Sequence, residues 1–137
     1  GKVCSKPVQL LDIYPTLLEL TNLEADPAHE GRSLVPLLED VEADWPYMAR
    51  SSFGPGNYTI ISEQYRFNQY NDGSEEFYDH SKDPQEWRNV IDHAEYETII
   101  EEHRTQIPQE RYEILGQDSW GHKSYEATEE NANARGR

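Results

Sequence analysis

The sequence predicts an α+β fold: a small antiparallel sheet of three to four strands covered by a C-terminal helix, with further helices before it. Three observations support this prediction. From Met48 to His80, aromatic and β-branched residues alternate with polar ones, and glycine-containing turns interrupt them. The stretch after His80 repeats apolar residues at helical spacing. The stretch before Met48 holds a dense apolar run that does not alternate.

The first predicted element is a helix from about Ile13 to Leu20, with Asp12 placed to cap it and Pro15 in its first turn. Apolar residues surround most of this helix: Leu10, Leu11, Ile13, Tyr14, Leu17, Leu18, Leu20 and Leu23. That pattern is typical of a helix buried on several sides. The helix could dock on its own small domain, or it could belong to a larger body. The second interpretation needs partner surface that this chain does not offer.

A second, short helix is expected to run to about Glu39. It follows a turn at Gly31, with Ser33 as its cap and Pro36 in its first turn.

Four runs then predict the strands of the sheet: YMARSSF, NYTIISE, YRFNQY and EEFYDH. GPG separates the first two runs, and NDGS separates the last two. In YRFNQY the rings alternate with Arg66 and Asn68, so one face of the sheet is expected to be dry and the other wet.

The last predicted helix lies in QEWRNVIDHAEYETIIEEHRTQIP and ends at Pro108. Its apolar face is expected to cover the dry face of the sheet with Tyr96, Ile99, Ile100 and His103. Residues 109–137 show no sustained period, and we expect a poorly ordered tail in which only Ile114, Leu115 and Trp120 favour docking.

The composition excludes some classes of function. The chain has 27 acidic and 12 basic residues and a net charge of -15, which argues against binding to nucleic acid or to an anionic membrane surface. No apolar run approaches the roughly 20 residues that cross a bilayer. The chain starts at Gly1 and its single Met is Met48, so we expect a processed chain or a fragment.

The stretch NDGSEEFYDHSKDPQE, residues 71–86, has two interpretations: a calcium-binding acidic loop, or a hairpin that leads into a short helical turn. A calcium loop needs carboxylates at alternate positions around a glycine, and this spacing fails. Asp72-Gly73 between alternating runs favours the hairpin, and Asp83-Pro84 favours a short helical turn at Gln85 and Glu86.

Other candidate chemistry is sparse. The five histidines, His29, His80, His93, His103 and His122, lack metal-ligand spacing, and the lone Cys4 has only Lys6 beside it as a cation. We therefore predict no catalytic residue and no metal ligand in this chain. The loop GPGNY, which displays Asn57 and Tyr58, is either a turn or a substrate contact.

Three segments resemble the C-terminal end of the sulfatase family, in the alkaline-phosphatase-like superfamily. VQLLDIYPTLLEL is similar to the family's V-x-L-x-D-hydrophobic-x-P-T-L-L-x-L helix, and EGRSLVPLL to its G-x-S-L-x-P-L-L segment. YRFNQYNDGSEEFYDHSKDPQEWRNV is similar to its R-Y-x-x-Y, E-L-Y-D and D-P-x-E-x-x-N signature. FGPGNY before this hairpin looks most like the iduronate-2-sulfatase-like branch.

The resemblance implies three parts. Residues 1–44 would be the end of a catalytic α/β domain whose remainder is missing, 45–108 the C-terminal sulfatase subdomain, and 109–137 the tail. Family members use a calcium ion and a formylglycine made from a C/S-x-P-x-R motif. Both are expected in the missing catalytic domain, because CSKPV at Cys4 places its proline one position too late and lacks the arginine.

The implied function is the C-terminal fragment of a sulfuric ester hydrolase, inactive alone, that completes the fold and shapes the substrate entrance. Asn57 and Tyr58 would lie near the substrate, a sulfated compound that could be a carbohydrate. The implied partner is the missing N-terminal catalytic domain, and the implied location of the parent is periplasmic or secreted. Two alternatives remain: a free-standing acidic module that binds carbohydrate or protein, and a phosphoester hydrolase of the same superfamily.

Overall fold

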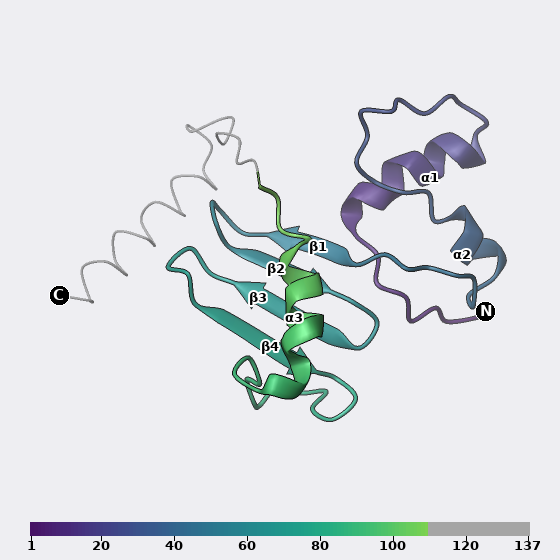
Figure 1. The fold of residues 1–137 in the computed structure, drawn as a ribbon. Helices are drawn as coiled ribbons and strands as arrows, with labels where there is room; N and C mark the ends of the chain where they lie inside the picture. Colours follow the sequence, from purple (N-terminus) through teal and green to yellow (C-terminus); the bar gives the residue numbers. More distant parts are fainter. Residues whose placement is uncertain (110–137) are drawn as a thin grey trace.

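The computed structural model describes residues 1–109 of the 137-residue chain. Its helices and strands follow one another along the chain as α1 (Ile13–Leu20), α2 (Val35–Glu39), β1 (Ala49–Ser52), β2 (Tyr58–Ile61), β3 (Tyr65–Gln69), β4 (Glu75–Asp79) and α3 (Glu97–Arg104). Short 3-10 turns at Leu10–Asp12 and Ala94–Tyr96 lead into α1 and α3. Figure 1 shows α1 and α2 beside the sheet and α3 across it. The predicted α+β fold is confirmed.

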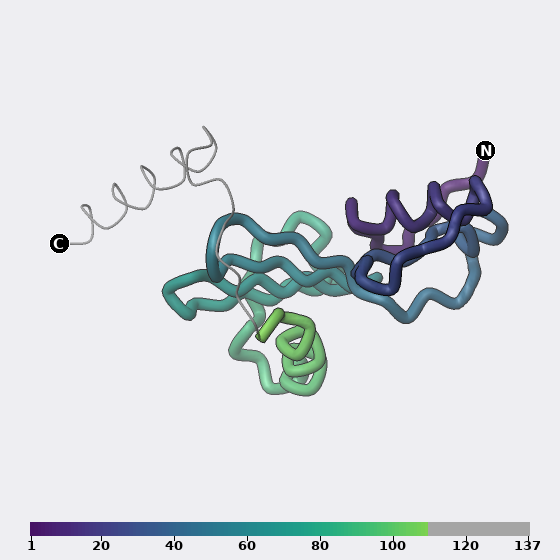
Figure 2. Tube along the Cα trace, turned by 90° about the horizontal axis from the view of Figure 1, so that it is seen from above, coloured from purple at the N-terminus to yellow at the C-terminus, as the bar shows by residue number. Residues whose placement is uncertain are grey.

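The sheet is an antiparallel meander with the strand order β1-β2-β3-β4. Its register aligns Ile60 with Phe67 and Phe67 with Phe77, and all three side chains are fully buried. Helix α3 lies on this face (Figures 1 and 2) and adds Ile100 to the same cluster, and the 3-10 turn before it adds Tyr96. The predicted dry face and its covering helix are therefore confirmed.

The opposite face of the sheet is polar. Ser51, Thr59, Asn68 and Glu76 face one another across the four strands, since each is the register partner of the next. None of the three described helices lies over this side in Figure 2. We call it the open face.

The N-terminal segment meets the sheet at strand β1. The backbone N–H of Arg50 donates to the side-chain oxygen of Gln9 at 3.1 Å, and the Arg50 guanidinium pairs with Glu30 at 2.9 Å. The indole N–H of Trp45 donates to the Pro7 carbonyl at 3.0 Å. These contacts fix residues 1–44 against edge strand β1. Because the Arg50 N–H is already bonded to Gln9, they also protect this edge from pairing with another chain.

Much of the apolar surface of α1 remains uncovered by residues 1–109. Leu17 is 54% exposed and Leu20 is 59% exposed, and Leu10 beside the helix is more exposed still. Thr16 is the buried residue of α1, and it holds the loop before α2. Residues 1–109 thus leave most leucines of this helix exposed, and the expectation that surface from elsewhere covers them stays a prediction.

The two predicted helix caps differ in outcome. Asp12 stands at the start of α1, but its carboxylate accepts from the backbone N–H of Gln9 at 3.0 Å and of Arg32 at 2.9 Å instead of capping the helix. At α2 the cap position is Leu34. The predicted cap, Ser33, lies one residue earlier, and its hydroxyl accepts from the backbone N–H of Val35, two residues on, at 3.2 Å, as a cap does.

The region around α3 also differs from the prediction. A hydrogen-bonded turn forms at Pro84 and Gln85, where the Glu86 N–H donates to the Asp83 carbonyl at 3.1 Å, but it does not continue as a helix because Glu86 has a positive φ of 57°. Helix α3 ends at Arg104, four residues before Pro108. The hairpin at Asp72-Gly73 is confirmed, whereas the predicted tail lies, apart from Gln109, outside the described residues.

Candidate functional site

The loop between β1 and β2 is closed by its own backbone and by Asn57. Gly54 and Gly56 both adopt positive φ, and the Phe53 N–H donates to the Asn57 carbonyl at 3.1 Å. The side-chain amide of Asn57 donates to the Phe53 carbonyl at 3.0 Å and accepts from the Asn71 backbone N–H at 3.1 Å. Asn57 thus joins this loop to the β3–β4 turn.

Tyr58 begins strand β2 and is partly buried against the core cluster. Asn57 and Tyr58 both border an open trough of about 300 Å³ beside the loop. The residues that give it polar and aromatic character are Ser51, Asn57, Thr59, Arg66, Asn68 and Tyr70. Hydroxyl, amide and guanidinium groups next to a phenol ring are suited to bind a polar ring such as a sugar.

A hydrogen-bond chain fixes the side chains on this face. Thr59 donates to the Asn68 amide oxygen at 2.9 Å, and the Asn68 amide donates to Glu76 at 3.1 Å. The Tyr70 hydroxyl donates to the same Glu76 oxygen at 2.7 Å. Burial alone would raise the pKa of Glu76, but hydrogen bonds from Tyr70, Asn68 and Tyr78 outweigh it and lower that pKa. The bond to Glu76, with burial, raises the pKa of Tyr70 to about 12, so Glu76 stays ionised and Tyr70 protonated at neutral pH.

Arg66 and Glu86 extend this arrangement toward the turn after β4. Arg66 donates to Glu86 at 3.1 Å, and the other carboxylate oxygen of Glu86 lies 2.7 Å from Nε2 of His80. Sequence reasoning placed Arg66 and Asn68 on the wet face through the alternation in YRFNQY, but it assigned no role to Arg66, Asn68, Thr59 or Tyr70. For Arg66, Asn68 and Thr59 the alternation was a sufficient signal, because these residues share one side of adjacent strands. Tyr70 follows β3, and the sequence interpretation counted it among the rings of the dry face.

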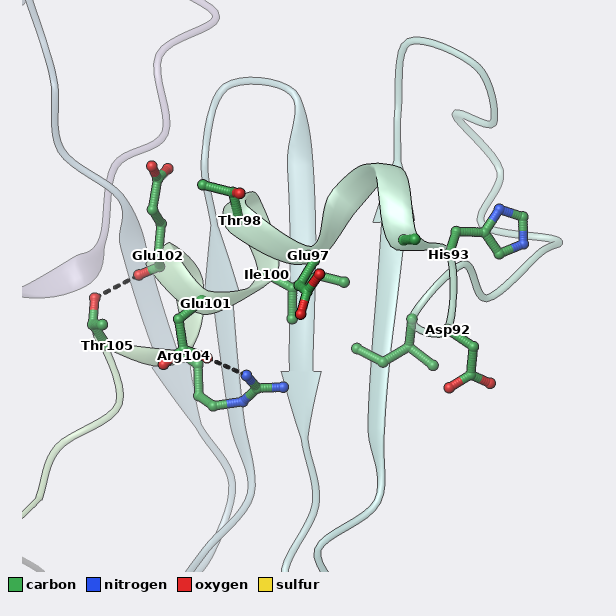
Figure 3. A pocket seen from close by; sticks show the side chains of 11 residues that line it. Asp92, His93, Glu97, Thr98, Ile100, Glu101, Glu102, Arg104 and Thr105 are labelled. Carbon is green, nitrogen blue, oxygen red and sulfur yellow. Dashed lines mark hydrogen bonds and ion pairs between the residues drawn. The ribbon is translucent and has the colours of Figure 1, made fainter.

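A larger groove of about 840 Å³ runs along α3 (Figure 3). Ile91 and Ile100 line it together with Glu97 and Glu101. Arg104, which pairs with Glu75 at 2.7 Å and also with Glu101, closes one side. Its acidic groups are too dispersed for a metal: residues 1–109 contain no group of three or more His, Cys, Asp or Glu that could hold one.

A buried carboxylate holds the segment after β4. Asp79 accepts from the Ser81 backbone at 3.0 Å and from the Gln64 amide at 3.2 Å through one oxygen, and from the Tyr96 hydroxyl at 3.0 Å through the other. Burial by itself would raise the pKa of Asp79, but these donors and the Ser81 hydroxyl lower it to about 2. The network links β4 to the entry of α3 and is structural.

Residues 1–113 match the family described as "N-sulphoglucosamine sulphohydrolase, C-terminal". Because the match covers most of the chain, the protein belongs to this family of C-terminal sulfatase domains. The resemblance stated from the sequence motifs is confirmed.

Curated relatives carry sulfatase names. The chain is 39% identical over 108 residues to a protein named "Sulfatase" of Formosa agariphila, covering 79% of this chain and 21% of that protein. It is 31% identical over 103 residues to a "Delta 4,5-hexuronate-2-O-sulfatase" of Bacteroides thetaiotaomicron, covering 69% of this chain and 21% of that protein. The chain therefore spans about a fifth of the length of these relatives.

Solved structures agree in fold. One is a complex with its substrate D-glucosamine-2-N,6-O-disulfate, at 30% identity and a TM-score of 0.57, covering 69% of this chain and 22% of that one. Another is described as a 2-O GAG sulfatase, at 27% identity and a TM-score of 0.53, with the same coverage. No helix among residues 1–109 is long and apolar enough to cross a membrane.

Proposed function

We propose that this chain is the C-terminal part of a sulfuric ester hydrolase, where it completes the fold of a catalytic part and shapes the substrate entrance. The observation that carries the proposal is the exposed apolar surface of α1, with Leu17 and Leu20 more than half exposed. A fully buried leucine contributes about 1.5–3 kcal/mol relative to an exposed one, so covering this surface stabilises the assembled protein. The chain's share of its relatives' length supports the same view.

Calcium and formylglycine, which sulfatases of this family use, belong in the proposed catalytic part. The described residues of this chain do not fit either group. They offer no cluster of metal ligands, and the Cys4 thiol donates to the Val41 carbonyl at 3.6 Å in a sequence that lacks the modification motif. We therefore assign no catalytic step to this chain and expect it to be inactive alone.

The substrate-proximal role falls on the loop that Asn57 closes. Its neighbouring trough, at about 300 Å³, matches the lower end of ligand-site volumes, roughly 300–1,000 Å³, and suits one sugar ring. Tyr70 borders the trough with aromatic surface, Tyr58 lines it while packing against the core cluster, and Asn57 holds the loop in place. A sulfated carbohydrate is the proposed substrate class, which the hexuronate and glucosamine names of the relatives support. A periplasmic or secreted location fits such a substrate.

Sulfate release tests the proposal. The full-length protein that carries this chain is incubated with sulfated oligosaccharides, and free sulfate is measured by ion chromatography, in parallel with the chain alone at several calcium concentrations. We expect release by the full-length protein and none by the chain. Turnover by the purified chain would refute the proposal.

Variants then test the two assigned surfaces in the full-length protein. Leu17→Glu is expected to lower the yield of assembled, active enzyme, because it places a charge in the proposed contact. Glu19→Gln, an exposed change on the same helix, is the matched control and should leave yield and activity unchanged. Asn57→Ala is expected to raise KM for oligosaccharide more than it lowers kcat, since it loosens a loop that borders the substrate.

A second candidate is phosphoester or phosphonate hydrolysis. The structure of a phosphonate monoester hydrolase of Agrobacterium radiobacter is similar at 25% identity and a TM-score of 0.53, covering 69% of this chain and 23% of that one. Parallel assays of the full-length protein with a sulfate monoester and a phosphonate monoester of the same alcohol separate the two activities.

A further inference from the structure

Trp87 is an exposed aromatic residue that neither the core nor the trough uses. Its side chain is 82% exposed, the highest value for any aromatic residue described. It lies in the turn between β4 and α3, and the next residue, Arg88, is also exposed. An indole that is left in water by its own chain is a frequent mark of a binding surface.

The backbone around Trp87 is held at several points. The Arg88 N–H donates to the Asp83 carboxylate at 2.8 Å, and the Glu86 N–H donates to the Asp83 carbonyl at 3.1 Å. On the other side, the Asn89 amide oxygen accepts from the Phe77 N–H at 2.9 Å. The turn therefore presents its exposed ring without the entropy loss that ordering a loose loop would add on binding.

The backbone conformation of Glu86 determines the shape of the turn. Its positive φ of 57° is unfavourable for a residue with a side chain. In this conformation the Glu86 carboxylate contacts both Arg66, at 3.1 Å, and His80, at 2.7 Å. Two charged or polar contacts thus hold a strained residue immediately before Trp87, so the exposure of the ring results from a defined conformation.

The charges near Trp87 are mostly occupied. Asp83 and Glu86 accept the bonds just described, and Lys82 pairs with Glu95 at 3.3 Å. Within residues 1–109, the Arg88 guanidinium has no hydrogen-bond or ion-pair partner. The available charge beside the indole is therefore a cation, on a chain whose net charge is -15. Asp83 keeps its negative charge while it accepts the Arg88 N–H. The Arg88 guanidinium is nevertheless available to an anion, and at physiological salt the acidic groups more than about 8 Å away are screened.

We propose that Trp87 and Arg88 form a surface site for a sulfated polysaccharide, separate from the trough. The indole packs on the apolar face of a sugar ring, and the guanidinium binds a sulfate through paired N–H donors. A second copy of the chain is a poor occupant, because two copies of net charge -15 repel and one indole supplies far less than the roughly 800 Å² per partner of a stable interface. The inference rests on the proposed function, which supplies the sulfated polymer.

Affinity electrophoresis tests the site with a matched pair of polymers, dextran sulfate and uncharged dextran, cast into native gels. We expect the chain to be retarded by dextran sulfate and not by dextran. Trp87→Ala and Arg88→Ala should each weaken binding to dextran sulfate about tenfold, a factor that corresponds to about 1.4 kcal/mol. Trp87→Phe should retain most of the binding, and Leu38→Ala, which removes another side chain that is 65% exposed, is the matched control.

Unchanged retardation of Trp87→Ala, equal retardation by the two polymers, or an equal loss in Leu38→Ala would each overturn the inference. The full-length protein must also be retarded by dextran sulfate, because a loss of binding there would mean that another part of the protein covers Trp87. Binding to dextran sulfate does not depend on hydrolysis. If the full-length protein releases sulfate from small substrates and dextran sulfate does not retard the chain, this inference alone is overturned. If dextran sulfate retards the chain and the full-length protein is inactive, the proposed function alone is overturned.

Discussion

Gly31 lies against the 3-10 turn that leads into α1. A Cβ built at this position would overlap the carbonyl carbon and oxygen of Leu11 and lie 3.0 Å from the Asp12 nitrogen. All three atoms belong to the backbone, which cannot turn aside as a flexible side chain can. Gly31→Ala therefore forces the loop away from the start of α1.

The cost follows from the bonds that this shift breaks. The Arg32 N–H donates to the Asp12 carboxylate at 2.9 Å, and the Leu34 N–H donates to the Thr16 hydroxyl at 2.8 Å. Lengthening by about 1 Å takes both outside hydrogen-bond range. A bond to a charged group contributes about 1.5–3 kcal/mol and a neutral one about 0.5–1.5 kcal/mol, so the loss is about 2–4 kcal/mol.

Native-state hydrogen exchange followed by NMR measures this loss residue by residue. Because about 1.4 kcal/mol is a tenfold change in an opening equilibrium, protected amides in residues 9–40 should exchange roughly 30-fold to 1,000-fold faster in Gly31→Ala. Amides of β2 and β3 serve as the internal reference and should change little. Gly73→Ala is the control variant, since it meets no atom within 4 Å but has φ of +85°, and its effect should stay within the β3–β4 hairpin.

Unchanged exchange in residues 9–40 would refute the steric argument. Equal acceleration of the β2 and β3 amides would instead refute the idea that the N-terminal segment opens independently of the sheet.

Three further outcomes are expected in chemical denaturation of the chain. Burial lowers the pKa of His103, and the Ile99 carbonyl and Glu102 oppose this shift. The contribution of His103 to stability is therefore complete above pH 6.5 and is lost as the pH falls below that value. The difference in unfolding free energy between wild type and His103→Gln should shrink between pH 7.5 and 5. Asp79, whose pKa is lowered from 3.8 to about 2, contributes stability above pH 3.8 that is lost as the pH falls through 2, and Asp79→Asn should cost about 1–2 kcal/mol at pH 7 and remove this acid step. Phe67→Ala should cost about 3–5 kcal/mol by leaving a cavity in a fully buried position, measured as a lower midpoint at constant m-value.

Alternation was sufficient to predict the sheet, and a dense apolar run was sufficient to predict α1, because those signals are local. The alternation in YRFNQY places Phe67 opposite Arg66 and Asn68 in any register, and the Asp-Gly turn fixes which residues pair. The cap predicted at Asp12 failed for a non-local reason. Asp12 binds the Arg32 N–H, 20 residues away, and such a contact leaves no trace in the sequence around Asp12.

The candidate site was less accessible to sequence reasoning. Asn57 was recognised as unusual, yet its bond to the Asn71 backbone depends on two turns meeting in space. The conformation of Glu86 is set by Arg66 and His80, which come from different parts of the sheet, whereas Asp83-Pro84 alone favours a helical turn. In both cases partners distant in sequence outweighed the local preference.

Two surfaces that residues 1–109 leave uncovered, α1 and the open face, differ in what they gain from a partner. On α1, leucine side chains stand in water, and each one covered by protein contributes hydrophobic stabilisation. On the open face, Glu76 already accepts from Asn68 and Tyr70, and Glu86 from Arg66, so a protein lid would remove water from satisfied charges and gain little. We therefore expect the proposed catalytic part to cover α1 and to leave the open face, with its trough, accessible to solvent and to a polar ligand.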